Sequence, residues 1–310
     1  MQASASRRVH RPSSTMRFES RIAESLIVSG LECGVRAAII PFAGVADKFG
    51  ESGILLIWNC SGTAAQTDSG VAVNILIIGA SRGLGKAFVE GLGTEGDRVI
   101  GVSRRRPEGL RPPAGLALDW IEADLSDPAQ AVRQVVSALP ERLDVVMCNV
   151  GVWEREAFEP SYAFSRCSDQ ELLDVVQVNI ASTILLLKHV LPRMSGAAKP
   201  QLFLTGSTSG LSRSGRPEVA FAASKFALSG MADALREEYR AQRLAVTCLQ
   251  LGYLNTEDDL SVPREQAAER GAGQLIPLHD VVSLARAVLN LSDASFAREI
   301  VLPAILDERF

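Results

Sequence analysis

Residues 73–85 read VNILIIGASRGLG, and this stretch decides the fold. The nearly continuous apolar run 73–78 is typical of a strand that is buried on both faces of a parallel sheet. The three glycines that follow it predict a tight turn into a helix over 86–92. Backbone N–H groups at the positive end of such a helix bind phosphate groups, so the pattern indicates a dinucleotide site.

Strand-like and helix-like segments alternate after this turn. Alternation of this kind implies right-handed crossovers and a parallel sheet with helices on both faces. We therefore predict an α/β protein with a Rossmann-like, doubly wound parallel sheet, whose ligand binds at the carboxyl ends of the strands. The expected strands are 99–103, 143–148, 201–205, 245–251 and 299–302, and the expected helices are 129–139, 169–194, 219–242 and 278–291.

The pattern begins near Val73, and we expect one compact domain over 73–310. Residues 1–22 hold five arginines, five serines and a single acid. That composition suits an organelle transit peptide, a disordered tail or sequence upstream of the true start. Residues 23–70 show no clean helical or strand period. We expect 1–72 to be a disordered extension, or no part of the mature protein.

The composition is that of an ordinary soluble protein. Of the 310 residues, 47% are hydrophobic and 22% charged, and the net charge of −4 makes nucleic acid and anionic membranes unexpected partners. No uninterrupted apolar run approaches the ~18 residues of a membrane span. The five scattered cysteines and three histidines show no metal-ligand spacing, so we expect free thiols, a reducing, cytoplasmic compartment and no metal site.

The glycine spacing Gly-x-x-x-Gly-x-Gly resembles that of the short-chain dehydrogenase/reductase family. Asp124-Leu125 resembles the family's adenine contact, and residues 148–151 (CNVG) resemble its Asn-Asn-Ala-Gly motif. Ile78 stands where the family usually has threonine. These motifs recur in order over nearly all of 73–310. The resemblance implies a nicotinamide cofactor bound by Gly79, Ser81, Arg82, Gly83, Leu84, Gly85, Arg104, Asp124, Leu125, Asn149, Gly151, Lys225 and Thr256.

The second expected strand ends in Ser103, Arg104, Arg105 and Arg106, with no acid to accept hydrogen bonds from a ribose 2′-hydroxyl. Arginine suits a 2′-phosphate instead, through charge-assisted bonds. Arg82 in the glycine loop is a second candidate, whereas Arg105 and Arg106 are as well explained as solvated loop charges. The cofactor that we predict is NADP(H).

The resemblance also implies four catalytic positions. Asparagine maps to Asn179 and lysine to Lys225. Serine maps to Ser207, fourteen residues before 221, although Thr208 lies at the family's usual spacing of thirteen. Residues 221–225 read FAASK, so Phe221 stands where the family has the tyrosine that acts as acid or base.

Phe221 and Lys225 are four residues apart and share one face of a helix. A lysine there would lower the pKa of a phenol from its usual value of about 10. Phenylalanine has nothing to ionise, and the loss of a general acid costs about 10²–10⁴ in rate. The alternative proton donors are a water molecule, Ser207, Tyr162 and Tyr253. If Tyr253 is not the donor, we expect it to be a packing residue.

Aromatic residues follow the expected strand 143–148, at Trp153, Phe158, Tyr162 and Phe164. We expect this segment beside a small-molecule substrate, with core packing or an interface as the alternatives. The long apolar patterns 172–194 and 219–242 predict a homodimer or homotetramer, as is common in the family that the chain resembles. The alternative is that both helices are simply well buried.

The sequence leaves three functions open. The first is an NADP(H)-dependent oxidoreductase that acts on a carbonyl or alcohol substrate with an atypical site lacking the tyrosine acid. The second is a catalytically lapsed NADP-binding regulatory or partner subunit. The third is non-redox chemistry on the same fold. Retention of Asn179, Ser207 and Lys225 favours an enzyme.

Overall fold

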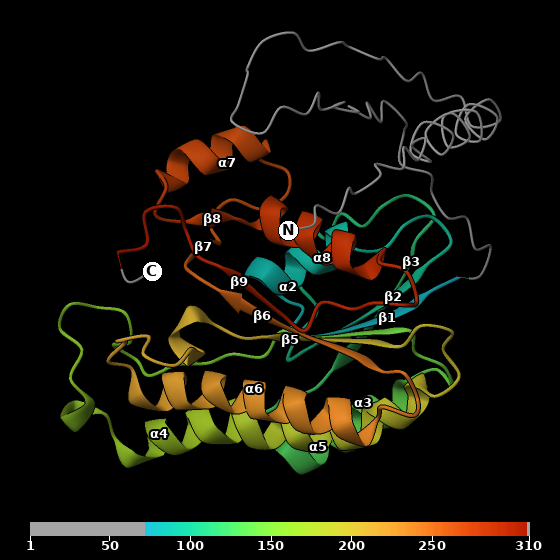
Figure 1. Ribbon diagram of the computed structural model, residues 1–310, viewed down its shortest axis with the longest axis horizontal. Coiled ribbons are helices and arrows are strands. Elements are labelled where there is room, and N and C mark those ends of the chain that lie inside the picture. The colour runs from blue at the N-terminus through green and yellow to red at the C-terminus, as the bar shows by residue number, and fades with distance from the viewer. Residues whose placement is uncertain (1–71, 309–310) are drawn as a thin grey trace, which may run out of the picture. The chain divides into compact units, whose positions relative to one another are not determined.

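The computed structural model describes residues 72–308 (Figure 1). Within them, parallel strands form a seven-stranded sheet in the order β3-β2-β1-β4-β5-β6-β9. The order reverses beside β1, which has β2 on one side and β4 on the other. The predicted doubly wound α/β fold is confirmed. The strands are β1 (Asn74–Ile78), β2 (Arg98–Ser103), β3 (Ala117–Glu122), β4 (Val145–Cys148), β5 (Gln201–Thr205), β6 (Ala245–Leu251) and β9 (Glu299–Leu302).

Helices cover both faces of the sheet. Figure 1 shows α3, α4, α5 and α6 on one face and α2 and α8 on the other. The helices are α2 (Gly83–Gly91), α3 (Pro128–Ala138), α4 (Asp169–Val176), α5 (Ser182–Val190), α6 (Val219–Glu238), α7 (Arg264–Gly271) and α8 (Leu278–Leu289).

The expectations for residues 1–71, including the free thiols of Cys33 and Cys60, concern residues that lie outside the described part of the chain.

The apolar run of β1 feeds two cores, because successive side chains of a strand point to opposite faces. Leu76 and Ile78 join the core formed with α3, α5 and α6. Ile75 and Ile77 join the core formed with α2 and α8. Each of these side chains contributes about 1.5–3 kcal/mol when fully buried. Burial on both faces thus explains why this strand lacks polar alternation.

Some elements differ from the sequence-based expectation. The expected helix 169–194 contains a π-helical turn, Gln177–Ala181, between α4 and α5. The strand β3 was not predicted, because it lies at the sheet edge and its half-exposed residues form no apolar run. The helix α7 and the two-residue strands β7 (Leu254–Asn255) and β8 (Ile276–Pro277), which pair in parallel, were also missed.

The helical stretch Asp169–Met194 is long and apolar enough, by length and composition, to cross a membrane. Its side chains Leu186, Leu187 and Val190 are buried in the core on that face of the sheet. Core helices pass the same test of length and composition, and packing against the sheet accounts for the apolar character of this one.

Candidate active site

The glycine loop lies closer to its surroundings than side chains would allow. A Cβ atom at Gly79, where φ is +82°, would lie 2.3 Å from the carbonyl oxygen of Asn149. A Cβ atom at Gly85 would lie 1.9 Å from the carbonyl oxygen of Gly79. The Asn149 side chain also donates from Nδ2 to that Gly79 oxygen, at 3.3 Å. Glycine is therefore required for α2 to begin this close to β1 and β4.

The N-terminus of α2 presents backbone donors. Arg82 precedes the helix and makes no side-chain capping bond, and the first turn holds no acid. The first N–H groups of a helix have no intrahelical acceptor, so these groups are suited to phosphate oxygens. Thr256 lies against the loop, 3.2 Å from a Cβ placed on Gly83. Leu84 is buried in the core and Ser81 is half-buried.

Two exposed arginines follow the neighbouring parallel strands β1 and β2. Arg82 lies after β1 and Arg104 lies directly after β2. Asp124 follows β3, and its Oδ1 accepts a hydrogen bond from the Ser126 backbone at 3.0 Å. Hydrogen bonds from Ser126, and then the charge of Arg104, lower the pKa of the Asp124 carboxyl. The next residue, Leu125, packs partly buried against the core.

Lys225 joins α6 to the ends of two strands. Its Nζ donates to the carbonyl oxygens of Val150, at 3.0 Å, and Thr205, at 2.9 Å. These oxygens lie just past β4 and at the end of β5. A Cβ on Gly151 would lie 3.1 Å from Nζ, and Lys225 is only 5% exposed. The structure therefore brings Lys225 and Gly151 together.

Phe221 belongs to an aromatic cluster made of Trp153, Phe158, Phe221 and Tyr253. Its ring centroid lies 5.2 Å from that of Phe158 and 6.3 Å from that of Trp153, both in edge-to-face geometry. Phe158 also contacts Tyr253, at 5.8 Å. On the other side, Lys225 Nζ lies 5.7 Å from the Phe221 centroid. The cluster forms an apolar wall beside the lysine.

Phe158 holds an unusual backbone conformation, with φ of +71°. The left-handed region is rare for a bulky residue and costs about 1–3 kcal/mol. Its N–H donates to Oε1 of the buried Glu218, at 3.2 Å, which helps to hold this turn. The strained turn places the Phe158 ring between Phe221 and Tyr253.

Asn179 lies in the π-helical turn and is 3% exposed. Its Oδ1 accepts from the Val152 N–H at 2.8 Å, and its Nδ2 donates to the Val152 carbonyl at 2.7 Å and to Ser224 Oγ at 2.9 Å. The side chain thus ties the segment after β4 to α6. Such turns occur frequently at functional sites.

Ser207 follows β5 and is half-buried. Its Oγ accepts from the Ser209 N–H at 3.1 Å, which caps the 3₁₀ turn Thr208–Gly210. Its own N–H donates to Gln250 Oε1 at 3.0 Å. The alternative residue in the register, Thr208, is buried.

The sequence pattern of the family described as short chain dehydrogenase matches residues 73–267. The chain belongs to that family. It is 34% identical over 194 residues to the uncharacterized oxidoreductase YciK of Escherichia coli, covering 59% of this chain and 73% of the relative. It is 25% identical over 197 residues to the 3-oxoacyl-[acyl-carrier-protein] reductase FabG of the same organism, covering 62% and 78%.

Solved structures share the fold of this short-chain dehydrogenase. A short chain dehydrogenase family protein of Francisella tularensis aligns over 76% of this chain and 99% of its own length, with a TM-score of 0.61. At 18% sequence identity, that likeness shows the fold alone.

Short-chain dehydrogenases are oxidoreductases that bind a nicotinamide cofactor, NAD or NADP. The residues present fit such a group, because the glycine loop leaves room that a Cβ would fill and the N-terminus of α2 has no side-chain cap. When bound, the cofactor supplies hydride chemistry, while the protein supplies binding and orientation.

A buried carboxylate in this short-chain dehydrogenase was not singled out from the sequence. Glu154 is 0% exposed, and its Oε1 accepts from the N–H groups of Ala220, at 2.8 Å, and Phe221, at 3.3 Å. It also accepts from the Tyr162 hydroxyl at 3.3 Å. Glu218 precedes α6 but makes no capping bond, so Glu154 caps this helix from a distant segment.

An ion pair near the aromatic cluster was also missed. Arg216 donates from Nη2 to both carboxylate oxygens of Asp307, each at 3.1 Å, and both side chains are largely buried. From Nη1 it donates to the Tyr253 hydroxyl at 2.9 Å, with its guanidinium 4.8 Å from that ring. The C-terminal segment is thereby tied to the segment before α6.

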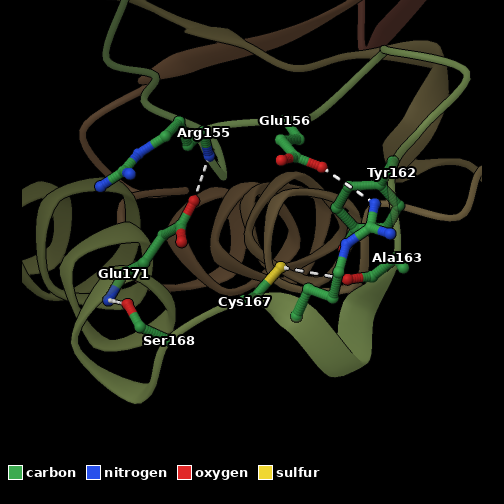
Figure 2. Close-up of a pocket in the computed structure, with 8 residues that line it drawn as sticks. Arg155, Glu156, Tyr162, Ala163, Cys167, Ser168 and Glu171 are labelled. Atoms are coloured by element: carbon green, nitrogen blue, oxygen red, sulfur yellow. Dashed lines mark hydrogen bonds and ion pairs between the residues drawn. The ribbon is translucent and has the colours of Figure 1, made fainter.

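Figure 2 shows a separate pocket in the loop between β4 and α4. Two of its carboxylates have partners there, since Arg166 pairs with Glu156 at 3.0 Å and the backbone N–H of Arg155 donates to Glu171. Burial is the main cause that raises the pKa of Tyr162 to about 12, so this phenol is a poor proton donor near neutral pH. The pocket is lined by Arg155, Glu156, Tyr162, Ala163, Arg166, Cys167, Ser168 and Glu171.

Proposed function

We propose that this chain is an NADP(H)-dependent oxidoreductase that interconverts a carbonyl group and an alcohol on a small molecule. The observation that carries the proposal is Lys225, whose buried Nζ is held at the ends of β4 and β5. That position lies at the carboxyl ends of the strands, as the glycine loop does, and doubly wound folds bind their ligand there. The 25% sequence identity with a 3-oxoacyl-[acyl-carrier-protein] reductase supports carbonyl reduction as the class of reaction.

In this proposal, the glycine loop and the N-terminus of α2 hold the diphosphate. Asp124 and Leu125 contact the adenine, and Arg82 and Arg104 bind the 2′-phosphate. Lys225 holds the nicotinamide ribose. The exposed positions of both arginines after adjacent strands support NADP(H) over NAD(H). Asn149, Gly151 and Thr256 complete this cofactor site, since each packs against the glycine loop or Lys225.

We also propose that Phe221 occupies the position of the family's tyrosine. Its place one turn before Lys225 and its contact with Nζ support this assignment. Ser207 orients the substrate oxygen, and Asn179 holds the segment after β4 in place. The aromatic cluster favours an apolar group on the substrate. Phe221 cannot give a proton, so another group must do so.

To test the proposal, NADPH oxidation by the full-length chain is measured with a panel of ketones, aldehydes and 3-oxoacyl thioesters. Turnover of at least one carbonyl compound is the expected result. Binding of NADPH and NADH is measured separately by the fluorescence of the reduced cofactor, and binding of neither would refute the proposal. The relatives of this chain that are named as an oxidoreductase and a reductase give no support to a regulatory or partner subunit.

The Arg104→Ser variant is expected to bind NADPH roughly 10- to 100-fold more weakly, because hydrogen bonds to charged groups contribute about 1.5–3 kcal/mol. Affinity for NADH, which lacks the 2′-phosphate, should stay unchanged. Fluorescence titration measures both. The control is Arg133→Ser, which removes the same charge from an exposed position on α3. Equal losses for NADPH and NADH in Arg104→Ser would contradict the phosphate contact.

We propose that the chain forms a homodimer or homotetramer through α4, α5 and α6. These helices expose large apolar side chains, among them Leu173 (61% exposed), Ile184 (49%) and Phe226 (54%). Figure 1 shows the three helices in one layer. Exposed apolar patches mark interaction surfaces. Light scattering should give at least twice the 33.2 kDa of one chain, and Leu173→Asp should lower that mass. A monomeric wild type would disprove the assembly.

A further inference from the structure

Lys225 is a buried cation without a carboxylate partner in residues 72–308. Its two hydrogen-bond partners are the backbone oxygens of Val150 and Thr205, which carry no full charge. Around it the backbone is packed tightly. A Cβ on Gly210 would lie 2.7 Å from the Lys225 carbonyl carbon, and one on Gly151 would lie 3.1 Å from Nζ. The ammonium is thus fixed in a place where its charge is poorly solvated.

The titratable groups that act on Lys225 are two thiols, Cys148 on β4 and Cys248 on β6. Both are free and buried. Burial raises the pKa of Cys148, and it raises that of Cys248 to about 11. Both thiols therefore stay mostly neutral near pH 8, and any thiolate charge would raise the pKa of Lys225 rather than lower it.

Burial lowers the pKa of Lys225 from 10.5 to about 8. An ammonium with this pKa is mostly protonated at pH 7 and gives up its proton far more readily than an exposed lysine. A general acid works best when its pKa lies near the operating pH. The residue that holds the cofactor in the proposed function thus also has the properties of an acid.

We propose that Lys225 Nζ supplies the proton to the substrate oxygen in this chain. The proposal rests on the proposed function and adds the identity of the proton donor. Within the described chain, two of the three Nζ donors bond to Val150 and Thr205, which leaves a single donor. In this proposal that donor turns from the ribose to the substrate oxygen for the proton transfer. Nζ lies 5.7 Å from the centroid of the Phe221 ring, where no hydroxyl is present. With Lys225 as the donor, no other residue of the site has to act as an acid.

In the direction of reduction, the carbonyl carbon of the substrate would gain a hydride, which is the chemistry that a bound reduced nicotinamide would supply. The two electrons of the hydride would form the new C–H bond, while the C=O π-bond breaks toward oxygen. Lys225 Nζ donates one proton to that oxygen, which gives the alcohol and leaves a neutral amine. The amine regains a proton from solvent. In the direction of oxidation, the neutral amine accepts the hydroxyl proton.

The first test measures the lysine directly, without substrate or cofactor. The sequence contains five lysines, Lys48, Lys86, Lys188, Lys199 and Lys225, so lysine labelled with ¹³C at Cε gives few NMR signals. The signal that disappears in Lys225→Arg belongs to Lys225. It is expected to titrate with a pKa of about 8. Titration at an ordinary lysine pKa would overturn the proposal. The cofactor-binding test of the proposed function fails or succeeds independently of this result.

The second test compares pH profiles of the two reaction directions. Reduction needs the ammonium, so kcat/KM, whose pH dependence reports the free enzyme, should fall as pH rises through the pKa measured by NMR. Oxidation needs the amine, so its rate should rise through the same pKa. Profiles that are flat across this range would overturn the proposal. So would loss of the transition in Tyr253→Phe or Ser207→Ala while Lys225 still titrates at the same pKa, because the proton would then come from that residue.

Discussion

The Phe221→Tyr variant is expected to reduce carbonyl substrates about 10²-fold faster than the wild type at pH 7. Tyrosine adds one hydroxyl to a ring that is already packed beside Lys225. A general acid contributes about 10²–10⁴ in rate, and we expect the low end because Lys225 already provides a proton in the wild type. The measurement is kcat for NADPH oxidation with saturating substrate.

The matched control is Phe226→Tyr, which adds the same hydroxyl on the same helix at a position that is 54% exposed. It should leave kcat unchanged. NADPH affinity should be similar in both variants, because the change concerns proton transfer rather than cofactor binding. A Phe221→Tyr protein that binds NADPH normally but is no faster than the wild type would show that Phe221 does not occupy the position of the acid.

The sequence predicts the strand–turn–helix at residues 73–91 well, because local pattern and tertiary burial agree there. β1 lies in the middle of the sheet, so both of its faces are apolar and the run is unbroken. The glycines after β1 are required because the turn into α2 leaves no room for side chains. Their spacing can be seen directly in the local sequence. The strand β3 could not be predicted in this way, because an edge strand with half-exposed residues has no continuous apolar run.

The surroundings of the site depend on contacts that no sequence spacing reveals. Glu154 caps α6 through Ala220, 66 residues away, and Arg216 pairs with Asp307, 91 residues away. The spacing between Phe221 and Lys225 places both on one helix face. It does not show that Lys225 is buried or that residues 72–308 provide no counter-ion for it. Burial is a tertiary property, and it changes the chemistry that the same residue can perform.

The structure also changes the interpretation of Phe221 under the proposed assignment to the position of the family's tyrosine. From the sequence, Phe221 marks a lost acid and makes a binding protein plausible. In the fold, the ring packs with Trp153 and Phe158, and the turn at Phe158 is held in a strained conformation. Strained backbone tends to occur at functional sites. The phenylalanine is thus part of an organised apolar wall, which favours a changed substrate environment over simple loss.

The Gly79→Ala variant is expected to lose about 3 kcal/mol or more in the free energy of unfolding. A methyl group there would lie 2.3 Å from the Asn149 carbonyl oxygen. That oxygen cannot withdraw easily, because the Asn149 N–H is bonded to the Ile78 carbonyl at 2.9 Å. The residue would also be strained at φ of +82°. Urea unfolding measures the loss, and NADPH binding should be lost with it.

Gly96→Ala separates the two causes, because Gly96 has a similar φ of +86° but no atom of the described residues lies within 4 Å of an added Cβ. This control should lose only about 1–2 kcal/mol, the cost of a left-handed alanine. The difference between the two variants therefore measures how closely the glycine loop approaches β4. If Gly79→Ala lost no more than Gly96→Ala and still bound NADPH, the close approach that forms the cofactor site would be wrong.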